Sequence, residues 1–114
     1  MKNDLPEFDL HEYGMRVDDA LSRLERVVSS ARAHGPRLFV VVTGYGSSGG
    51  TSRIKSAVLE TCRRYRSQNH IRGFLDGELA ADFFTSEYLS FPAAASIPPR
   101  YRRSPNPGIV FICV

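Results

Sequence analysis

The chain has 114 residues, a length that suits one domain with a single hydrophobic core. With 42% hydrophobic and 24% charged residues, its composition excludes a disordered chain. It contains neither the apolar stretch of a signal peptide nor the roughly 18 apolar residues that span a bilayer, so we expect a cytoplasmic protein with no membrane contact. The net charge of +3 divides into −3 over residues 1–30 and +6 over residues 31–114, which favours a polyanion-binding surface in the later segments. A solvated arginine-rich surface would explain the charge equally well.

The first half of the chain predicts a strand, a helix, a second strand and a loop. Residues 7–11 alternate polar and apolar, which places Phe8 and Leu10 inward. Residues 16–33 have helical spacing of apolar positions, and Gly35-Pro36 ends that helix. Residues 37–43 form a β-branched and aromatic run typical of a strand buried on both faces. The glycine and serine residues that follow predict a loop.

The second half predicts a helix over residues 51–66, a short strand over 70–75 and a final strand over 108–114. The order is therefore β-α-β-α-β-β. Residues 76–107 fit this pattern poorly and are interpreted as an irregular insertion within one domain that covers residues 1–114. Within it, residues 78–89 predict a short helix, and the proline-rich residues 90–107 predict an extended segment.

The two cysteines, Cys62 and Cys113, lie on the apolar face of a predicted helix and in a predicted buried strand. We expect two buried free thiols, with a disulfide as the alternative. No Cys/His group has the spacing of zinc ligands, so the sequence predicts no structural metal.

The first candidate catalytic group is Asp9 and His11. Residues two apart on a strand project to the same side, about 6.6 to 6.8 Å apart along the strand axis, so both side chains could reach one phosphate. A histidine exchanges protons near neutral pH, and a nearby carboxylate can orient its ring. The pair suits phosphodiester chemistry, although two polar residues on a solvated strand would have the same spacing.

The second candidate group is the glycine-rich segment over residues 43–50, which begins with Thr43, Gly44, Tyr45 and Gly46. Glycines let backbone N–H groups converge, and a helix N-terminus after the loop favours an anion. The segment therefore predicts a phosphate-binding loop. It lacks the Gly-Lys-Ser/Thr ending of a Walker A loop, and a flexible connector would also explain it.

The third candidate group contains basic residues that could neutralise phosphates: Arg53, Lys55, Arg100, Arg102 and Arg103. Tyr45 or Tyr101 could stack on a base. Other arginines on the second helix are explained by a solvated face. His34 fits the end of a helix, where it interacts with the dipole, and His70 has no evident partner in the sequence.

In this order the motifs resemble the small MutS-related (Smr) domain family, which pairs a Leu-Asp-Leu-His-Gly-like strand end with a Thr/His-Gly-x-Gly loop. The corresponding segments here are Phe8-Asp9-Leu10-His11 and Thr43-Gly44-Tyr45-Gly46. Residues 15–21 are similar to the family's helix opening, and Gly108 begins the final strand. The resemblance covers about residues 7–75 and 107–114. The chain differs from the family in Glu12-Tyr13 after His11, in a tyrosine where a basic residue is common between the loop glycines, and in a longer insertion over residues 76–106.

The resemblance implies a two-layer α/β fold in which helices pack on a four-stranded mixed sheet, like the C-terminal domain of bacterial translation initiation factor three. It also implies endonuclease or nicking activity on nucleic acid. The family's proposed active site maps onto Asp9, His11, Gly44 and Gly46, and Arg53 lies near a position where relatives carry a basic residue.

The leading hypothesis is an endonuclease that acts on RNA or on structured or branched DNA. His11 would exchange a proton, Asp9 would orient it, and the glycine loop with Arg53 would hold the phosphate. With RNA, attack by the adjacent 2′-hydroxyl needs no cofactor, whereas DNA hydrolysis would more readily use a divalent ion such as Mg²⁺. One alternative is a non-catalytic nucleic-acid-binding module. Another is an adaptor that binds a protein through an exposed apolar patch around Phe83, Phe84 and Tyr88.

Overall fold

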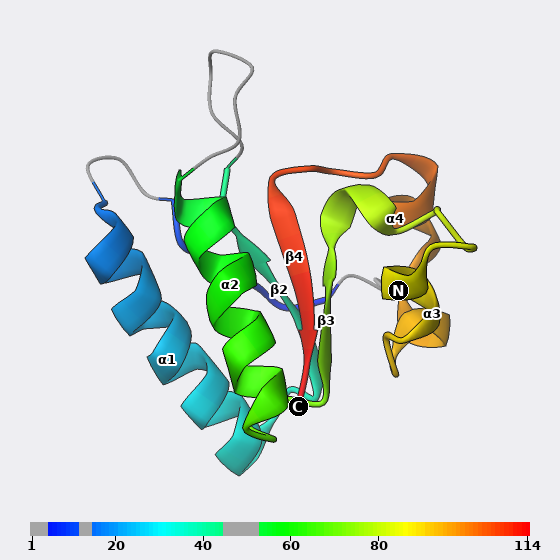
Figure 1. Cartoon of the computed structure of the whole chain (residues 1–114). Helices are drawn as coiled ribbons and strands as arrows, with labels where there is room; N and C mark the ends of the chain where they lie inside the picture. The colour runs from blue at the N-terminus through cyan, green and yellow to red at the C-terminus, as the bar shows by residue number, and fades with distance from the viewer. Residues whose placement is uncertain (1–4, 12–14, 45–52) are drawn as a thin grey trace.

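The computed structural model of the chain describes residues 5–11, 15–44 and 53–114. In chain order its elements are β1 (Glu7–Asp9), α1 (Val17–His34), β2 (Leu38–Val42), α2 (Arg53–Ser67), β3 (Gly73–Asp76), the 3-10 helix η1 (Gly77–Leu79), α3 (Ser86–Leu89), the 3-10 helix η2 (Ala94–Ser96), α4 (Pro99–Arg103) and β4 (Ile109–Cys113). The four strands and the two long helices follow the predicted order β-α-β-α-β-β (Figure 1). The α/β fold class with a four-stranded mixed sheet is confirmed.

The strands form one sheet in the order β1-β2-β4-β3. β1 runs parallel to β2, and β4 runs antiparallel to both β2 and β3. As a result, β1, β2 and β3 all end at the same edge of the sheet, where β4 begins. This edge is called the carboxyl edge below, and the edge where β1, β2 and β3 begin is called the amino edge.

The long helices α1 and α2 lie side by side on one face of the sheet (Figure 1). α1 has Asp18 and Asp19 in its first turn and Arg32 and His34 in its last, an arrangement that favours the helix dipole at both ends. The apolar stripes of both helices pack against inward residues of β2 and β4. This core cluster contains Leu10, Ala20, Leu24, Val28, Ala31, Phe39, Val41, Ile54, Val58, Cys62, Ile71, Val110 and Ile112.

The other face of the sheet is covered by the segment between β3 and β4, which contains α3 and α4 (Figure 1). Alternate residues of β2 and β4 face this segment, which explains why both strands are apolar almost throughout. The second core cluster contains Val40, Leu75, Ala80, Phe91, Ile97, Tyr101, Ile109, Phe111 and Cys113. The expectation of an extended segment over residues 90–107 is therefore wrong, because apolar side chains fold this segment onto the sheet.

The predicted helix over residues 78–89 is instead two short helices with a turn between them. The Asp76 carboxylate accepts a hydrogen bond from the Glu78 N–H at 3.1 Å, and this contact starts η1. The Thr85 hydroxyl oxygen accepts one from the Tyr88 N–H at 3.2 Å, and this contact starts α3. Each polar side chain caps a new helix, so the segment breaks where helical spacing alone predicts continuity.

Cys62 and Cys113 are both buried free thiols, as predicted. They belong to different core clusters, on opposite faces of the sheet. Burial raises the pKa of the Cys62 thiol to about 12. Among the helices of the described residues, none has the length and apolar character needed to cross a membrane.

Candidate functional site

The pairing of β1 with β2 brings the two predicted motifs together at the carboxyl edge. Asp9 lies opposite Val42, and the Leu10 N–H donates to the Val42 carbonyl at 2.8 Å, which extends the pairing one residue beyond β1. His11 then packs against Gly44. A Cβ atom at Gly44 would lie 2.8 Å from both Cγ and Nδ1 of the His11 ring, and Gly44 has a φ of +68°. The site thus needs glycine for two reasons, the close approach of the ring and the left-handed backbone.

Asp9 is hydrogen bonded to the main chain of His11 rather than to its ring. Its Oδ1 atom accepts from the His11 N–H at 2.7 Å. Arg23 of α1 donates from Nη1 to the Asp9 carbonyl oxygen at 2.9 Å. Both Asp9 and His11 are exposed to solvent. These contacts fix the backbone that carries His11 and leave the imidazole accessible to a ligand.

Arg23 is a residue of this site that sequence reasoning missed. It lies fourteen positions after Asp9 and on a different element, so no local spacing connects the two. Only the packing of α1 beside β1 brings its guanidinium to the strand end.

Thr43 anchors the start of the glycine-rich segment to β4. The Gly108 carbonyl oxygen accepts from the Thr43 N–H at 2.7 Å, from the Gly44 N–H at 3.1 Å and from the Thr43 hydroxyl at 3.2 Å. Thr43 is fully buried, so its side chain is not accessible to a ligand. Tyr45 and Gly46, like Glu12 and Tyr13, lie outside the described residues.

The two basic residues at the start of α2 have different environments. Arg53, its first residue, is exposed at the carboxyl edge. Lys55 is only 5% exposed, and its Nζ lies 3.0 Å from Oδ1 of Asp76 at the end of β3. The structure therefore gives Lys55 a carboxylate partner in place of the predicted phosphate, and this ion pair ties α2 to the segment that covers the second face.

The arginines of α4 also have partners within the protein. Arg100 donates from Nη2 to the Glu7 carboxylate at 2.8 Å, and the Tyr101 hydroxyl donates to the same oxygen at 2.8 Å. Arg102 donates to the Ala94 carbonyl oxygen at 2.7 Å. Arg103 is exposed. Arg100 thus joins the insertion to β1, and Arg102 joins it to itself.

Tyr101 does not offer the base-stacking surface that the sequence suggests. Its side chain is 5% exposed and makes an edge-to-face contact with Phe111, with ring centroids 5.2 Å apart. Burial raises the pKa of its hydroxyl. The aromatic ring is therefore part of the second core cluster.

Among residues 5–11, 15–44 and 53–114, no group of three or more His, Cys, Asp or Glu side chains is arranged to hold a metal ion. The described site offers a histidine, a carboxylate, arginines and a glycine backbone. This donor set can exchange a proton and attract a phosphate.

The fold and the site define an α/β domain in which an Asp-x-His strand end and a Thr-Gly loop start lie side by side at one edge of the sheet. The family model of the Smr domain matches residues 8–81, and the chain belongs to the Smr domain family. This family is known for nucleic-acid binding and nuclease activity. Among solved structures, the chain is similar to the Smr domain of Thermus thermophilus MutS2, with 20% sequence identity, 96% of each chain covered and a TM-score of 0.58. At this identity the likeness shows the fold. No curated protein matches the chain.

Proposed function

We propose that this protein is an endonuclease that cleaves phosphodiester bonds in RNA, or in structured or branched DNA, at the carboxyl edge of its sheet. The observation that carries the proposal is the contact between His11 and Gly44. Two motifs separated by a helix and a strand in the sequence meet there, so a phosphate bound at this edge would lie beside an exposed imidazole. The membership of the Smr family supports nucleic acid as the substrate class.

With an RNA substrate, each group of the site has a defined task. His11 accepts the proton of the 2′-hydroxyl, whose oxygen attacks the adjacent phosphorus. The bond from phosphorus to the 5′-oxygen breaks, which leaves a 2′,3′-cyclic phosphate, and the departing 5′-oxygen takes a proton from water to become a 5′-hydroxyl. Gly44 N–H is already bonded to Gly108, so among the described residues the phosphate contact is assigned to the exposed Arg53. Asp9 positions His11 through its backbone N–H.

The charge and the hydrogen bond of Asp9 can be separated by substitution. Asp9→Asn keeps an oxygen for the His11 N–H but removes the negative charge, whereas Asp9→Ala removes both. If Asp9 acts by holding the backbone, the Asn variant keeps most of its activity and the Ala variant loses it. Asp82→Asn, an exposed carboxylate outside the site, is the matched control for the change of charge.

The test of function incubates labelled single-stranded RNA, duplex DNA and branched DNA with the wild type, His11→Ala and the three Asp variants, with Mg²⁺ or with EDTA. We expect cleavage by the wild type and by Asp82→Asn, and loss of cleavage in His11→Ala by at least about 100-fold, the scale of general acid-base catalysis. Equal cleavage by the wild type and by His11→Ala would refute the catalytic role.

A second candidate is a nucleic-acid-binding module without cleavage. The observation that favours it is that the Asp9 carboxylate is engaged by a backbone N–H and makes no contact with the His11 ring. This hypothesis expects salt-dependent binding to all substrates, with no product in any of them.

The adaptor alternative depends on the aromatic residues of the insertion. Phe83 is 46% exposed and Phe84 is 91% exposed, whereas Tyr88 is half-buried beneath Phe83, with ring centroids 5.2 Å apart. This hypothesis expects Phe84→Ser to abolish partner binding and to leave nucleic-acid affinity unchanged.

A further inference from the structure

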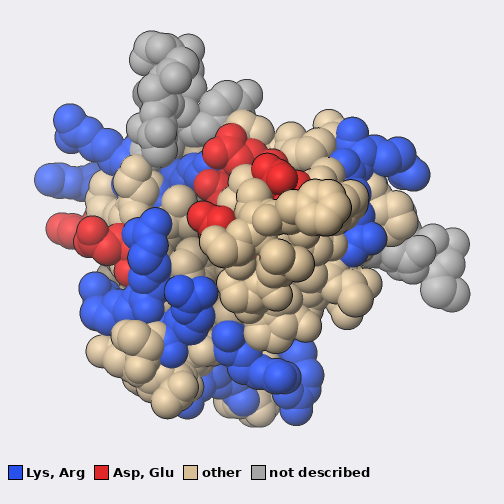
Figure 2. Space-filling model, turned by 45° about the vertical axis from the view of Figure 1, so that its right-hand side comes forward, with Lys and Arg blue, Asp and Glu red and all other residues tan. Residues whose placement is uncertain are grey.

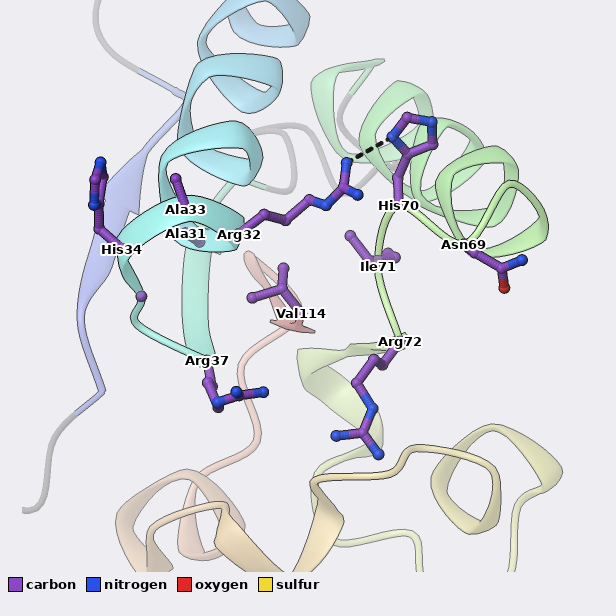
Figure 3. A pocket seen from close by; sticks show the side chains of 11 residues that line it. Ala31, Arg32, Ala33, His34, Arg37, Asn69, His70, Ile71, Arg72 and Val114 are labelled. Atoms are coloured by element: carbon purple, nitrogen blue, oxygen red, sulfur yellow. Dashed lines mark hydrogen bonds between the residues drawn. The ribbon is translucent and has the colours of Figure 1, made fainter.

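A cavity of about 520 Å³ lies at the amino edge of the sheet, at the opposite end of the molecule from His11 (Figure 3). Its volume is within the roughly 300 to 1,000 Å³ of small-ligand pockets. The side chains that surround it combine basic groups with an apolar floor. They come from Ala31, Arg32, Ala33, His34, Gly35, Arg37, Asn69, His70, Ile71, Arg72 and Val114.

The sheet register fixes the position of two arginines of this cavity. Arg37 directly precedes β2 and Arg72 directly precedes β3, and these two strands flank β4. The Arg37 carbonyl oxygen accepts from the Val114 N–H at 2.9 Å, and the Arg72 N–H donates to the Cys113 carbonyl oxygen at 2.9 Å. Because both backbones are held on either side of the end of β4, the two guanidinium groups belong to one wall, at the bottom of the view in Figure 3.

The opposite wall is formed by Arg32 and His70, which come from α1 and from the turn after α2. Arg32 Nη1 lies 3.0 Å from His70 Nδ1 (Figure 3). A guanidinium only donates, so Nδ1 of His70 is the acceptor in this contact. Asn69, with a φ of +61°, turns the chain after α2 and directs His70 to this position. The wall therefore offers hydrogen-bond donors to a ligand.

Three arginines, Arg32, Arg37 and Arg72, give the cavity an excess of positive charge. In the described part of the chain, no Asp or Glu lines the cavity, and none of Arg32, Arg37 and Arg72 forms an ion pair with a carboxylate. Figure 2 shows Lys and Arg side chains gathered at this lower end, whereas the Asp and Glu side chains of that view lie higher. The dipole of α1 accounts for cations in its last turn, but Arg37 and Arg72 precede strands and gain nothing from it.

A second cavity of about 270 Å³ lies beside the first, between α1 and the residue Phe8 of β1. It shares Ala31 and Gly35 with the first cavity and continues along α1 past Arg26 to Arg23. Arg23 in turn donates to the Asp9 carbonyl oxygen. The helix from Arg23 to His34 is about 17 Å long at roughly 1.5 Å per residue. That length matches about five phosphates at roughly 3.4 Å per nucleotide of a stacked strand.

We propose that the cavity around Arg37, Arg72 and His70, called the distal phosphate pocket below, binds phosphate groups of the same nucleic-acid strand that reaches His11. Between the two ends the strand passes the second cavity, which Arg23 and Arg26 line. This inference rests on the proposed function in its choice of substrate class. A substrate must therefore extend several nucleotides beyond the scissile bond to bind this protein with full affinity.

Histidine signals can report on the two ends separately, because the chain has three histidines, one at the candidate site and two in the distal phosphate pocket. The experiment follows the ring C–H signals of His11, His34 and His70 by NMR, assigned with single His→Gln variants. The probes are 2′-O-methyl RNA strands of about four and about twelve nucleotides, which lack the attacking hydroxyl, and uridine 5′-monophosphate. We expect the long strand to shift all three signals and the short strand to shift mainly His11.

The same strands are used to measure affinity against salt for the wild type, for Arg37→Gln/Arg72→Gln and for Arg63→Gln/Arg64→Gln. The last pair is the matched control, since Arg63 and Arg64 are exposed on α2 and lie outside both cavities. Each lost phosphate contact lowers the slope of log affinity against log salt by about 0.7 for single strands. We expect the pocket variant to lose about 1.4 in slope with the long strand and nothing with the short one, and the control to lose nothing with either.

Equal losses in the pocket variant and the control would overturn the proposal, because net charge alone would then explain the binding. Shifts of His34 and His70 with the mononucleotide, without a slope change for the long strand, would assign the pocket to a free nucleotide and also overturn it. The nuclease proposal fails independently. If no substrate is cleaved but the pocket variant loses its slope, the distal phosphate pocket stands and catalysis does not. If cleavage occurs and the salt slope of the pocket variant equals that of the wild type, catalysis stands and the distal phosphate pocket does not.

Discussion

The contact between Gly44 and His11 makes the catalytic proposal sensitive to one methyl group. Gly44→Ala places a Cβ 2.8 Å from two atoms of the His11 ring, whereas ordinary carbon contacts are about 3.5 to 4.0 Å. The ring must therefore move by about 1 Å, and a misplacement of about 1 Å at a reacting group costs roughly 100-fold in rate. The left-handed backbone of residue 44 adds a strain of about 1–2 kcal/mol to the free energy of folding.

Gly35→Ala is the matched control. Gly35 has a φ of +84°, so alanine is strained there too, but the nearest atom to its Cβ would be the Arg37 nitrogen at 4.0 Å. We expect both variants to be destabilised by about 1–3 kcal/mol in urea unfolding. Only Gly44→Ala should lose about 100-fold in cleavage of a short substrate, together with a shift of the His11 NMR signals.

Two results would refute this reasoning. One is a Gly44→Ala variant that cleaves like the wild type although it is destabilised, since the His11 ring would then have no part in the reaction. The other is an equal loss of cleavage in both variants, which would trace the effect to stability.

Two further predictions concern buried titratable groups. Lys55→Met should lower the free energy of unfolding by about 3 kcal/mol, because it leaves the Asp76 carboxylate, 18% exposed, without its ion-pair partner. The double variant Lys55→Met/Asp76→Asn should recover at least about 1 kcal/mol in the same urea titration. No recovery would show that the two residues are not coupled. Because the Cys62 thiol ionises near its ordinary pKa of 9.0 in the unfolded chain, while burial raises the pKa to about 12 in the folded protein, stability should fall by about 1.4 kcal/mol per pH unit above pH 9. Between about pH 8 and about pH 10, urea unfolding should show a loss of about 1.4 kcal/mol from this thiol in the wild type and a smaller total loss in Cys62→Ala, and equal losses would contradict the prediction.

The amino-acid sequence by itself determined the strands, the two long helices and the two motifs of the candidate site. The apolar spacing of α1 and the continuous apolar runs of β2 and β4 are local patterns, and each follows from which faces an element buries. The glycine of the loop was also recognisable, because few other residues adopt its backbone conformation. These features depend on neighbours in the chain.

Only the tertiary structure decided how the basic residues are used. Lys55 and Arg100 are similar in the sequence to any phosphate-binding cation, but in the fold Asp76 lies beside the buried Lys55 and Glu7 beside the exposed Arg100. Arg37 and Arg72 are thirty-five positions apart and carry no motif, yet the register of β2 and β3 against β4 brings them to one cavity. The sequence identifies a charged residue by its type alone. Its partner in the fold is set by contacts between segments that are distant in the sequence.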